Sequence, residues 1–344
     1  MTGQPTLASI GCAVPQQAFD QDDLAARLAE AWQLRDLQLE RWQRIVRGAG
    51  VERRHAVADL ATTIGMSTAK RMRVYAEAAP PLALDAARKA LDDAHIDASR
   101  VTDCIVVSCT GFVAPGVGPI LAQRLGLSRR VRHNQVGFMG CFGGILGIRA
   151  AIGAASADPR AVVLVLCVEL CSLHVRAATD AQSLVAAALF ADGAAAVVVL
   201  GADAGVGALG ELALGHTEIV ADSADEMTWC IEDDGFAMTL TRQVPKALEV
   251  SIAPFLLRDP PRGIAVHPGG TGILDAVHRG TESLALDPRS ITTSREILRN
   301  FGNMSSGSVL FVLDAYTRSG GASPVDLVAF GPGLTLDAVR LQRD

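Results

Sequence analysis

The chain has 344 residues, of which 49% are hydrophobic and 20% charged, and its formal net charge is −6. This length allows two domains and a large core, and this composition excludes a disordered chain, a collagen-like repeat and a disulfide miniprotein. The acidic balance excludes a global basic field for nucleic acid or anionic lipid. Residues 1–13 lack a signal-peptide pattern, and the most apolar run, 161–168, is far shorter than the ~20 residues of a membrane span. We therefore expect a cytoplasmic α/β protein with no membrane span and no nucleic-acid partner.

Short β-branched runs predict buried strands at 104–108, 161–168, 194–200, 263–266 and 325–330. Stretches of helical spacing lie between them, and the one at 80–94 opens with Pro-Pro, which suits a first helical turn. Buried strands that alternate with helices predict sheets covered on both faces. A Gly-, Ala- and Asp-rich segment at 201–210 is the best boundary, and similar strand-then-glycine patterns at 197–201 and 328–331 indicate two similar halves.

The seven cysteines, an odd number in a long chain, are interpreted as reduced thiols. Cys171 and His174 have a C-x-x-H spacing, but no second pair at zinc-site spacing accompanies them, so no metal site is predicted.

The segment around Cys141, HNQVGFMGCFGGILGIRAAIGAA at 133–155, predicts a strand, a sharp turn and a buried helix. Cys141 then lies at a helix N-terminus, where free N–H groups and the helix dipole lower the pKa of a thiol. One alternative is an inert cysteine in a tightly packed turn. A dinucleotide loop is the other alternative, although the glycines do not give the G-x-G-x-x-G spacing.

Two further polar residues lie beside glycines. His267 ends a predicted strand and precedes Pro-Gly-Gly, so it is either a structural histidine or one that transfers a proton or pairs with a thiolate. Asn303 follows a glycine and precedes an apolar helix, so its side chain can cap that helix or bind an oxyanion. Cys, His and Asn together suit thioester chemistry, because Cys accepts the acyl group and the other two donate hydrogen bonds to a developing enolate.

Several motifs together carry a resemblance: GCFGG around Cys141, ALFADGAAA at 188–196, HPGGTGILD at 267–275, REILRNFGNMSS at 295–306 and FGPGLT at 330–335. Over nearly its whole length the chain resembles the type III polyketide synthases, the chalcone-synthase-like branch of the thiolase superfamily. A chain-initiating ketoacyl-carrier synthase is less similar, since it usually has His-Gln-Ala-Asn where this chain has His-Pro-Gly-Gly. A thiolase carries a second catalytic Cys instead of the Asn.

The resemblance implies an α/β, thiolase-like αβαβα layered fold made of two similar halves. Residues 1–204 would form the half with the nucleophile, and residues 205–344 the half with His267 and Asn303. It also implies a homodimer that uses acyl-CoA and malonyl-CoA as substrates and needs no cofactor. Cys141 would hold the starter and the growing chain, while His267 would pair with its thiolate and, with Asn303, bind the malonyl carbonyl during decarboxylation.

By the same resemblance, Phe190 matches the gatekeeper between the CoA tunnel and the cavity, and Met238 replaces a second gatekeeper phenylalanine. Without the family, both would be core residues. Arg41, Arg44 and Arg47 share one predicted helix face. The first two match positions that contact CoA phosphates and the third lies one residue from such a position, while the alternative is a solvated helix face. Gly269, Gly270 and Gly272 correspond to backbone beside the pantetheine arm.

The predicted pocket departs from plant chalcone synthases. Its further residues are Cys109, which replaces Thr, Trp229, which replaces Gly, His174, which replaces Thr, Cys171 and Ser305. Trp229 with the GF-x-M pattern is typical of bacterial enzymes that extend fatty acyl-CoA to alkylpyrones or alkylresorcinols, which is the predicted product class. One alternative is a malonyl-CoA-only synthase with a phloroglucinol or tetrahydroxynaphthalene-type product. The other, from a different class, is a non-catalytic acyl-CoA-binding partner subunit.

Overall fold

The computed structural model describes residues 3–177, 180–205 and 209–343. Its elements up to residue 200 are β1 (Thr6–Ala13), β2 (Ala18–Asp20), α1 (Gln21–Ala31), α2 (Asp36–Ala49), β3 (Arg53–His55), α3 (Leu60–Thr63), α4 (Thr68–Asp93), η1 (Ala98–Arg100), β4 (Asp103–Ser108), α5 (Val117–Leu125), β5 (Arg132–Gly137), η2 (Gly140–Phe142), α6 (Gly143–Ala157), β6 (Val162–Leu170), η3 (Cys171–His174), α7 (Ala181–Leu189) and β7 (Asp192–Leu200). The later elements are β8 (Gly210–Ile219), β9 (Met227–Glu232), β10 (Gly235–Leu240), α8 (Gln243–Leu257), β11 (Gly263–Val266), α9 (Thr271–Gly280), α10 (Arg289–Phe301), η4 (Ser305–Gly307), α11 (Ser308–Arg318), β12 (Val325–Gly331) and β13 (Thr335–Gln342).

The main sheet has nine strands in the order β11-β12-β13-β8-β1-β7-β6-β4-β5, and its two sections share a four-strand topology, to which the first section adds β5 at its edge. In the first section β4 and β6 are parallel, and β7 and then β1 each pair antiparallel with the strand before. In the second section β11 and β12 are parallel, and β13 and then β8 each pair antiparallel with the strand before. The sections join where Leu7 of β1 pairs with Gly210 of β8. The prediction of two similar halves is confirmed. The predicted correspondence of 197–201 with 328–331 is wrong, because the counterpart of β7 is β13 and not β12.

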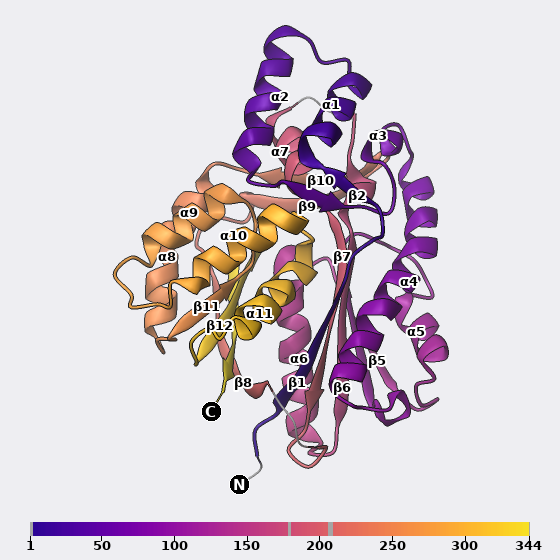
Figure 1. Cartoon of the computed structure of the whole chain (residues 1–344), viewed down its shortest axis with the longest axis vertical. Coiled ribbons are helices and arrows are strands. Elements are labelled where there is room, and N and C mark those ends of the chain that lie inside the picture. Colours follow the sequence, from indigo (N-terminus) through magenta and orange to yellow (C-terminus); the bar gives the residue numbers. More distant parts are fainter. Residues whose placement is uncertain (1–2, 178–179, 206–208, 344) are drawn as a thin grey trace.

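Helices cover both faces of each section of the sheet, with α4 and α5 on one side, α8 and α9 on the other, and α6 and α11 between the two sections (Figure 1). Successive side chains of a strand point to opposite faces, so a strand covered on both faces is apolar at every position. Along β6, Val165 and Cys167 face the central helices, whereas Leu164 and Leu166 face α4 and α5. The predicted five-layer αβαβα arrangement is confirmed.

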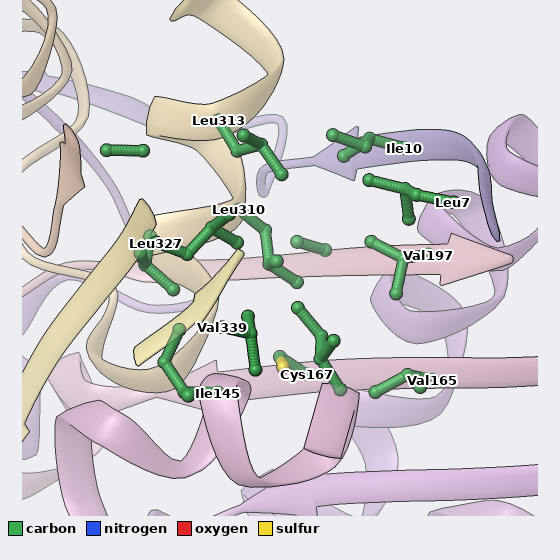
Figure 2. Packing of buried hydrophobic residues seen from close by; sticks show 14 of the residues in the cluster. Leu7, Ile10, Ile145, Val165, Cys167, Val197, Leu310, Leu313, Leu327 and Val339 are labelled. Carbon is green, nitrogen blue, oxygen red and sulfur yellow. The ribbon is translucent and has the colours of Figure 1, made fainter. Parts of the chain in front are cut away.

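Figure 2 shows how the central helices fill the space between the two sections of the sheet. Ile145 of α6 and Leu310 of α11 point into one cluster with side chains of β6, β7, β12 and β13. All five predicted strands are present within two residues of their expected bounds. The apolar segment Gly140–Ala157 is long enough to cross a membrane by length and composition, but half of it is buried in this central layer, as in a core helix.

One predicted boundary is wrong. Helix α4 begins at Thr68, where the Ser67 side chain caps it, and Pro80 and Pro81 lie inside the helix. A proline in a helix interior removes one backbone hydrogen bond, which is why the sequence pattern indicated a start there. The buried face of α4, which includes Tyr75 and Ala79, packs against the sheet and keeps the chain helical through both prolines.

Candidate active site

Cys141 lies in η2, the single turn that joins the end of β5 to the start of α6. The preceding Gly140 has φ +63°, and a Cβ there would come within 2.7 Å of the Pro332 ring. Only glycine fits such a position without a shift of the backbone. The predicted strand, turn and helix are therefore confirmed, with Cys141 at the N-terminal end of α6.

The Cys141 thiol does not have the low pKa that the sequence predicted. Burial is the largest influence and raises its pKa to about 12, while hydrogen bonds from Ser305 and Asn303 act in the opposite direction and the charge of Glu169 raises it further. Loss of hydration in this apolar turn outweighs the favourable effect of the helix end on a thiolate.

His267 follows β11, and its backbone N–H donates to the carbonyl oxygen of Val328 at 2.8 Å. The residue is 2% exposed, and within the described part of the chain neither ring nitrogen has a hydrogen-bond partner. Burial lowers the pKa of His267 to about 3, so at neutral pH the ring has one donor and one free acceptor. Because buried polar atoms are normally paired, this ring is suited to a ligand.

Asn303 is held next to Phe190 by an isolated parallel bridge. Its N–H donates to Leu189, and its carbonyl oxygen accepts from the N–H of Ala191, each at 2.9 Å. Its side-chain Oδ1 accepts the Ser305 N–H at 2.8 Å, in a tight turn where Ser305 has φ +49°. Since Oδ1 is engaged, the Nδ2 amide remains as a donor.

Three adjoining cavities share walls at this site. The front cavity is lined by Cys141, Phe190, Met238, Gly269, His267 and Asn303, among others. The middle cavity is lined by Cys109, Cys141, Cys171, Phe190, Trp229, Met238 and Ser305, among others. The rear cavity is lined by Cys171, His174, Phe190, Trp229, Phe236 and Met238, among others. The structure thus brings all the predicted catalytic and pocket residues together.

The predicted CoA-contacting residues lie outside these cavities, with the exception of Gly269. Arg41, Arg44 and Arg47 lie on the exposed face of α2. The end of α2 lies beside the start of α9, where the Thr271 hydroxyl donates to the carbonyl oxygen of Gly48 at 2.6 Å. Gly270 has φ +140° and precedes α9, and Gly272 is exposed in its first turn.

Glu169 was missed as a site residue. Its carboxylate is fully buried and accepts hydrogen bonds from the N–H of Cys109 at 3.1 Å, from the Thr110 hydroxyl at 2.7 Å and from the Ser306 hydroxyl. Burial raises the pKa of this carboxyl group. The signal in the sequence was a single acidic residue after an apolar strand. Among the described residues, no group of three His, Cys, Asp or Glu side chains is placed to hold a metal ion.

A five-layer fold with a cysteine at the start of a central helix defines a thiolase-like acyltransferase. The comparison with protein families is more specific. Residues 1–204 match the N-terminal domain, and residues 211–343 the C-terminal domain, of chalcone and stilbene synthases. The chain belongs to this family, the type III polyketide synthases.

Two curated proteins are similar over 97% of this chain. The "Alpha-pyrone synthesis polyketide synthase-like Pks18" of Mycobacterium tuberculosis is 29% identical, over 90% of its own length. The "Probable polyketide synthase 1" of Dictyostelium discoideum is 28% identical, and the chain spans 11% of that longer protein.

Two solved structures share the fold over the whole chain. PKS-I from the brown alga Ectocarpus siliculosus has a TM-score of 0.89 and 28% identity, over 100% of this chain and 99% of that one. The C-terminal type III polyketide synthase domain of Steely1 from Dictyostelium has a TM-score of 0.92 and 26% identity, over 99% of each chain.

Proposed function

We propose that this protein loads an acyl-CoA starter on Cys141, extends it with malonyl-CoA and closes the product to an alkylpyrone or alkylresorcinol. The observation that carries this function is the front cavity, in which a thiol, an amide donor and an imidazole that has no partner among the described residues meet. A subunit that only bound acyl-CoA would have no use for this combination.

In the loading step, neutral His267 accepts the proton of the Cys141 thiol. The thiolate attacks the carbonyl carbon of acyl-CoA, the carbon–sulfur bond to CoA breaks, and the departing thiolate takes the proton from His267. A thiolate and an imidazolium formed together stabilise each other in this low-dielectric cavity, which offsets the loss of hydration that each would suffer alone. The acyl group is then a thioester of Cys141.

In the extension step, the thioester carbonyl of malonyl-CoA accepts hydrogen bonds from the His267 ring and the Asn303 amide. As carbon dioxide leaves, its bonding electron pair passes to the enolate, and one donor placed at such an oxygen typically lowers the barrier by about 3–4 kcal/mol. The enolate carbon attacks the acyl carbonyl on Cys141, a carbon–carbon bond forms, and the Cys141 thiolate leaves. Decarboxylation supplies the carbanion, so we propose that no cofactor or metal is involved.

The apolar lining of the middle cavity supports a fatty acyl starter. Phe190, Met227, Trp229 and Met238 line the middle cavity, and none of its lining residues is charged. The similarity to Pks18, whose name specifies alpha-pyrone synthesis, favours closure by an enol oxygen that attacks the thioester carbonyl and expels the thiolate.

A specific observation favours the malonyl-only alternative as a second candidate. Each of the three cavities has a volume of about 30 Å³, which is room for about two water molecules. A long acyl chain would need the cavity walls to move, whereas acetyl-sized units demand less space.

We propose that the phosphates of CoA bind the exposed Arg face of α2. Arg41, Arg44 and Arg47 offer permanently charged forks suited to phosphate, and the α2–α9 contact brings this helix beside Gly269 of the front cavity. The pantetheine arm would then pass along the backbone of Gly269 and Gly270, while Gly272 lies further out on α9.

We also propose a cytoplasmic homodimer. Strand β5 ends the nine-stranded sheet, and an unpaired edge readily pairs with another strand. Beside it, Phe112, Phe138 and Met139 are 67%, 51% and 42% exposed. Such a grouping of apolar side chains at a sheet edge is typical of an interface between copies. Light scattering coupled to size exclusion measures the mass directly, and a monomer at micromolar concentration would contradict this assignment.

Mass spectrometry of the products tests the function. The enzyme is incubated with malonyl-CoA alone and together with acetyl-, hexanoyl-, lauroyl-, stearoyl- or coumaroyl-CoA, with Cys141→Ala as the matched control. We expect masses that rise by decarboxylated malonyl units on a fatty starter, and none from the control. One product that no starter changes supports the malonyl-only candidate, and absence of both product and acyl-Cys141 supports the binding subunit.

A further inference from the structure

A chain of hydrogen-bonding side chains leads away from Cys141, and the reaction steps proposed above use none of its other members. The Ser305 hydroxyl bonds the Cys141 thiol and lies 3.3 Å from Sγ of Cys109. Sγ of Cys109 in turn lies 3.4 Å from Oε1 of Glu169. Hydroxyl and thiol groups both donate and accept hydrogen bonds, so two such groups connect the nucleophile to a buried carboxyl group.

The chain continues beyond Glu169 to Tyr75 of α4. The Ser108 hydroxyl donates to Oε2 of Glu169 at 3.4 Å and accepts from the Tyr75 hydroxyl at 2.7 Å. Ser108 and Tyr75 are 5% and 2% exposed. A Cβ on Gly111 would lie 2.2 Å from the Tyr75 ring, so the absence of a side chain there makes room for the ring. The chain thus passes from the central layer, at the carboxyl ends of β4 and β6, to the α4 side of the main sheet.

The outer end of the chain meets a fourth cavity. Tyr75 and Ser108 line this cavity, whose volume of about 290 Å³ is room for several water molecules. Phe112 and Phe138, which are largely exposed, line it as well, and β5 contributes the polar side chains of residues 133–135. The fourth cavity shares no lining residue with the front, middle and rear cavities. The hydrogen-bond chain therefore joins the site to a polar cavity at the protein surface.

The proposed extension step needs a proton that neither substrate supplies. When malonyl-CoA loses carbon dioxide, the negative charge of its carboxylate stays behind, first on the enolate and then on the Cys141 thiolate that leaves. Loading, in contrast, is balanced within the site, because His267 passes the thiol proton to the CoA thiolate. One proton per malonyl unit must therefore enter, since a thiolate left in this apolar site would be a buried charge without a partner.

We infer that Tyr75 and Ser108 are the outer members of a proton relay that returns a proton to Cys141 after each extension, and that the fourth cavity is where this proton enters. The inference rests on the proposed extension step for the need of a proton. The route itself rests on the hydrogen bonds and on the cavity at their outer end.

The transfer leaves every member of the relay as it was. Each O–H or S–H bond breaks as the next group inward takes the proton, so that a proton passes from water to Tyr75 and in turn to Ser108, Glu169, Cys109, Ser305 and Cys141. Glu169 gains a proton at Oε2 and gives one up at Oε1, which requires its carboxyl group to be protonated. Burial raises the pKa of this group and so favours that form. The water molecule becomes hydroxide, which exchanges with the solvent.

Two variants interrupt the relay, and a third is the matched control. Tyr75→Phe keeps the ring beside Gly111 and removes the outer hydroxyl, and Ser108→Ala breaks the chain one position further in. Tyr316 is the only other tyrosine of the sequence and is also fully buried, and its hydroxyl donates to Asp287 at 3.1 Å, outside the site. Tyr316→Phe therefore removes a comparable hydroxyl without touching the relay.

Two rates are measured for each variant and for the double variant Tyr75→Phe with Ser108→Ala. Loading of Cys141, with the starter that gives the most product in the survey above, is followed by intact-protein mass spectrometry. Steady-state release of labelled carbon dioxide from malonyl-CoA reports complete extension cycles, and it is measured in H₂O and in D₂O. A variant that only disturbed the structure of the site would slow both steps.

We expect Tyr75→Phe to slow the release of carbon dioxide by about 10–100-fold and to leave loading unchanged. A positioned proton-transfer group typically contributes about 10²–10⁴-fold, and Ser108 still reaches the cavity in this variant. The solvent isotope effect should grow, because proton transfer then limits the rate. The double variant should be no slower than Ser108→Ala alone, since both changes block one route. Tyr316→Phe should match the wild type in both rates.

Three results would overturn the relay. Wild-type rates and isotope effects in both Tyr75→Phe and Ser108→Ala would show that the proton enters through the front cavity. Equal slowing of loading and extension, or effects that multiply in the double variant, would show that the two hydroxyls are structural. A wild type that loads Cys141 or not but releases no carbon dioxide would instead contradict the proposed function, and with it the need for a relay.

Discussion

The backbones of Asn303 and Phe190 pair in a bridge, which holds the amide donor of the front cavity beside the phenylalanine that we predict to be the gatekeeper. A buried cation supports this pair. Nη1 of Arg54 donates to the carbonyl oxygens of Phe190 at 2.9 Å and Ala187 at 2.6 Å. The guanidinium also faces the charge of the fully buried Asp192. One arginine thus binds two carbonyl oxygens at the end of α7.

Arg54→Met is expected to destabilise the protein by about 1–3 kcal/mol, since it leaves the carbonyl oxygens of Ala187 and Phe190 buried without their donor. Urea unfolding, monitored by circular dichroism, measures the loss in free energy of unfolding. Arg54→Lys is the control, because lysine keeps the charge but lacks the forked guanidinium. A loss below about 1 kcal/mol, the size of one ordinary hydrogen bond, would contradict the structural role of this cation.

Asn303→Ala should slow the decarboxylation of malonyl-CoA by about 10²–10³-fold, the usual effect of removing one donor from an oxyanion site. Release of labelled carbon dioxide measures this step. Acylation of Cys141 by the starter, measured by intact-protein mass spectrometry, serves as the control, because in the proposed loading step the amide hydrogen-bonds only the Cys141 sulfur and not a substrate carbonyl. If acylation and decarboxylation slowed by the same factor, the role of Asn303 would be to maintain the structure of the site and not to bind the enolate.

His174→Gln should remove some of the acid sensitivity of the wild type. Burial lowers the pKa of His174 from 6.5 to about 4, so the unfolded chain binds a proton here before the folded one does. The stabilisation is therefore present above pH 6.5 and is lost as the pH falls towards 4, by about 3 kcal/mol in total. Urea unfolding of both proteins at pH 7, 5.5 and 4.5 should show a difference that changes with pH. Parallel curves would show that the ring does not titrate in this range.

Gly140→Ala should destabilise the turn before α6, because the added Cβ would lie 2.7 Å from Cδ of Pro332 at a φ of +63°. We expect at least about 1–2 kcal/mol from the left-handed conformation alone. Gly48→Ala is the matched control, since nothing lies within 4 Å of a Cβ there, and alanine is better by up to about 1 kcal/mol in a helix. Equal melting temperatures for the two variants would contradict the geometry of the turn.

Features that depend on a few neighbouring residues could be predicted from the sequence. Each of the five predicted strands is a short apolar run, as expected for a strand that is covered on both faces. The strands were therefore found to within two residues of their observed bounds. The turn at Cys141 was found because Gly140 admits the left-handed backbone before it and two further glycines, Gly143 and Gly144, follow closely. Cys141, His267 and Asn303 were found as a set because their residue types share one chemistry, and the structure places them around one cavity.

Other features depend on segments of the chain that meet only in the folded protein. Helix α4 runs through Pro80 because the sheet packs against its buried face, and no local pattern contains that sheet. The pKa of Cys141 rises because distant segments remove water from its surroundings. Glu169 and the ring nitrogens of His174 have their roles through partners far away in the sequence. The sequence by itself determined the strands, the turn at Cys141 and the residue types of the candidate site. Only the tertiary structure decided the protonation states and the walls of its cavities, because hydration and hydrogen-bond partners depend on which surfaces come together.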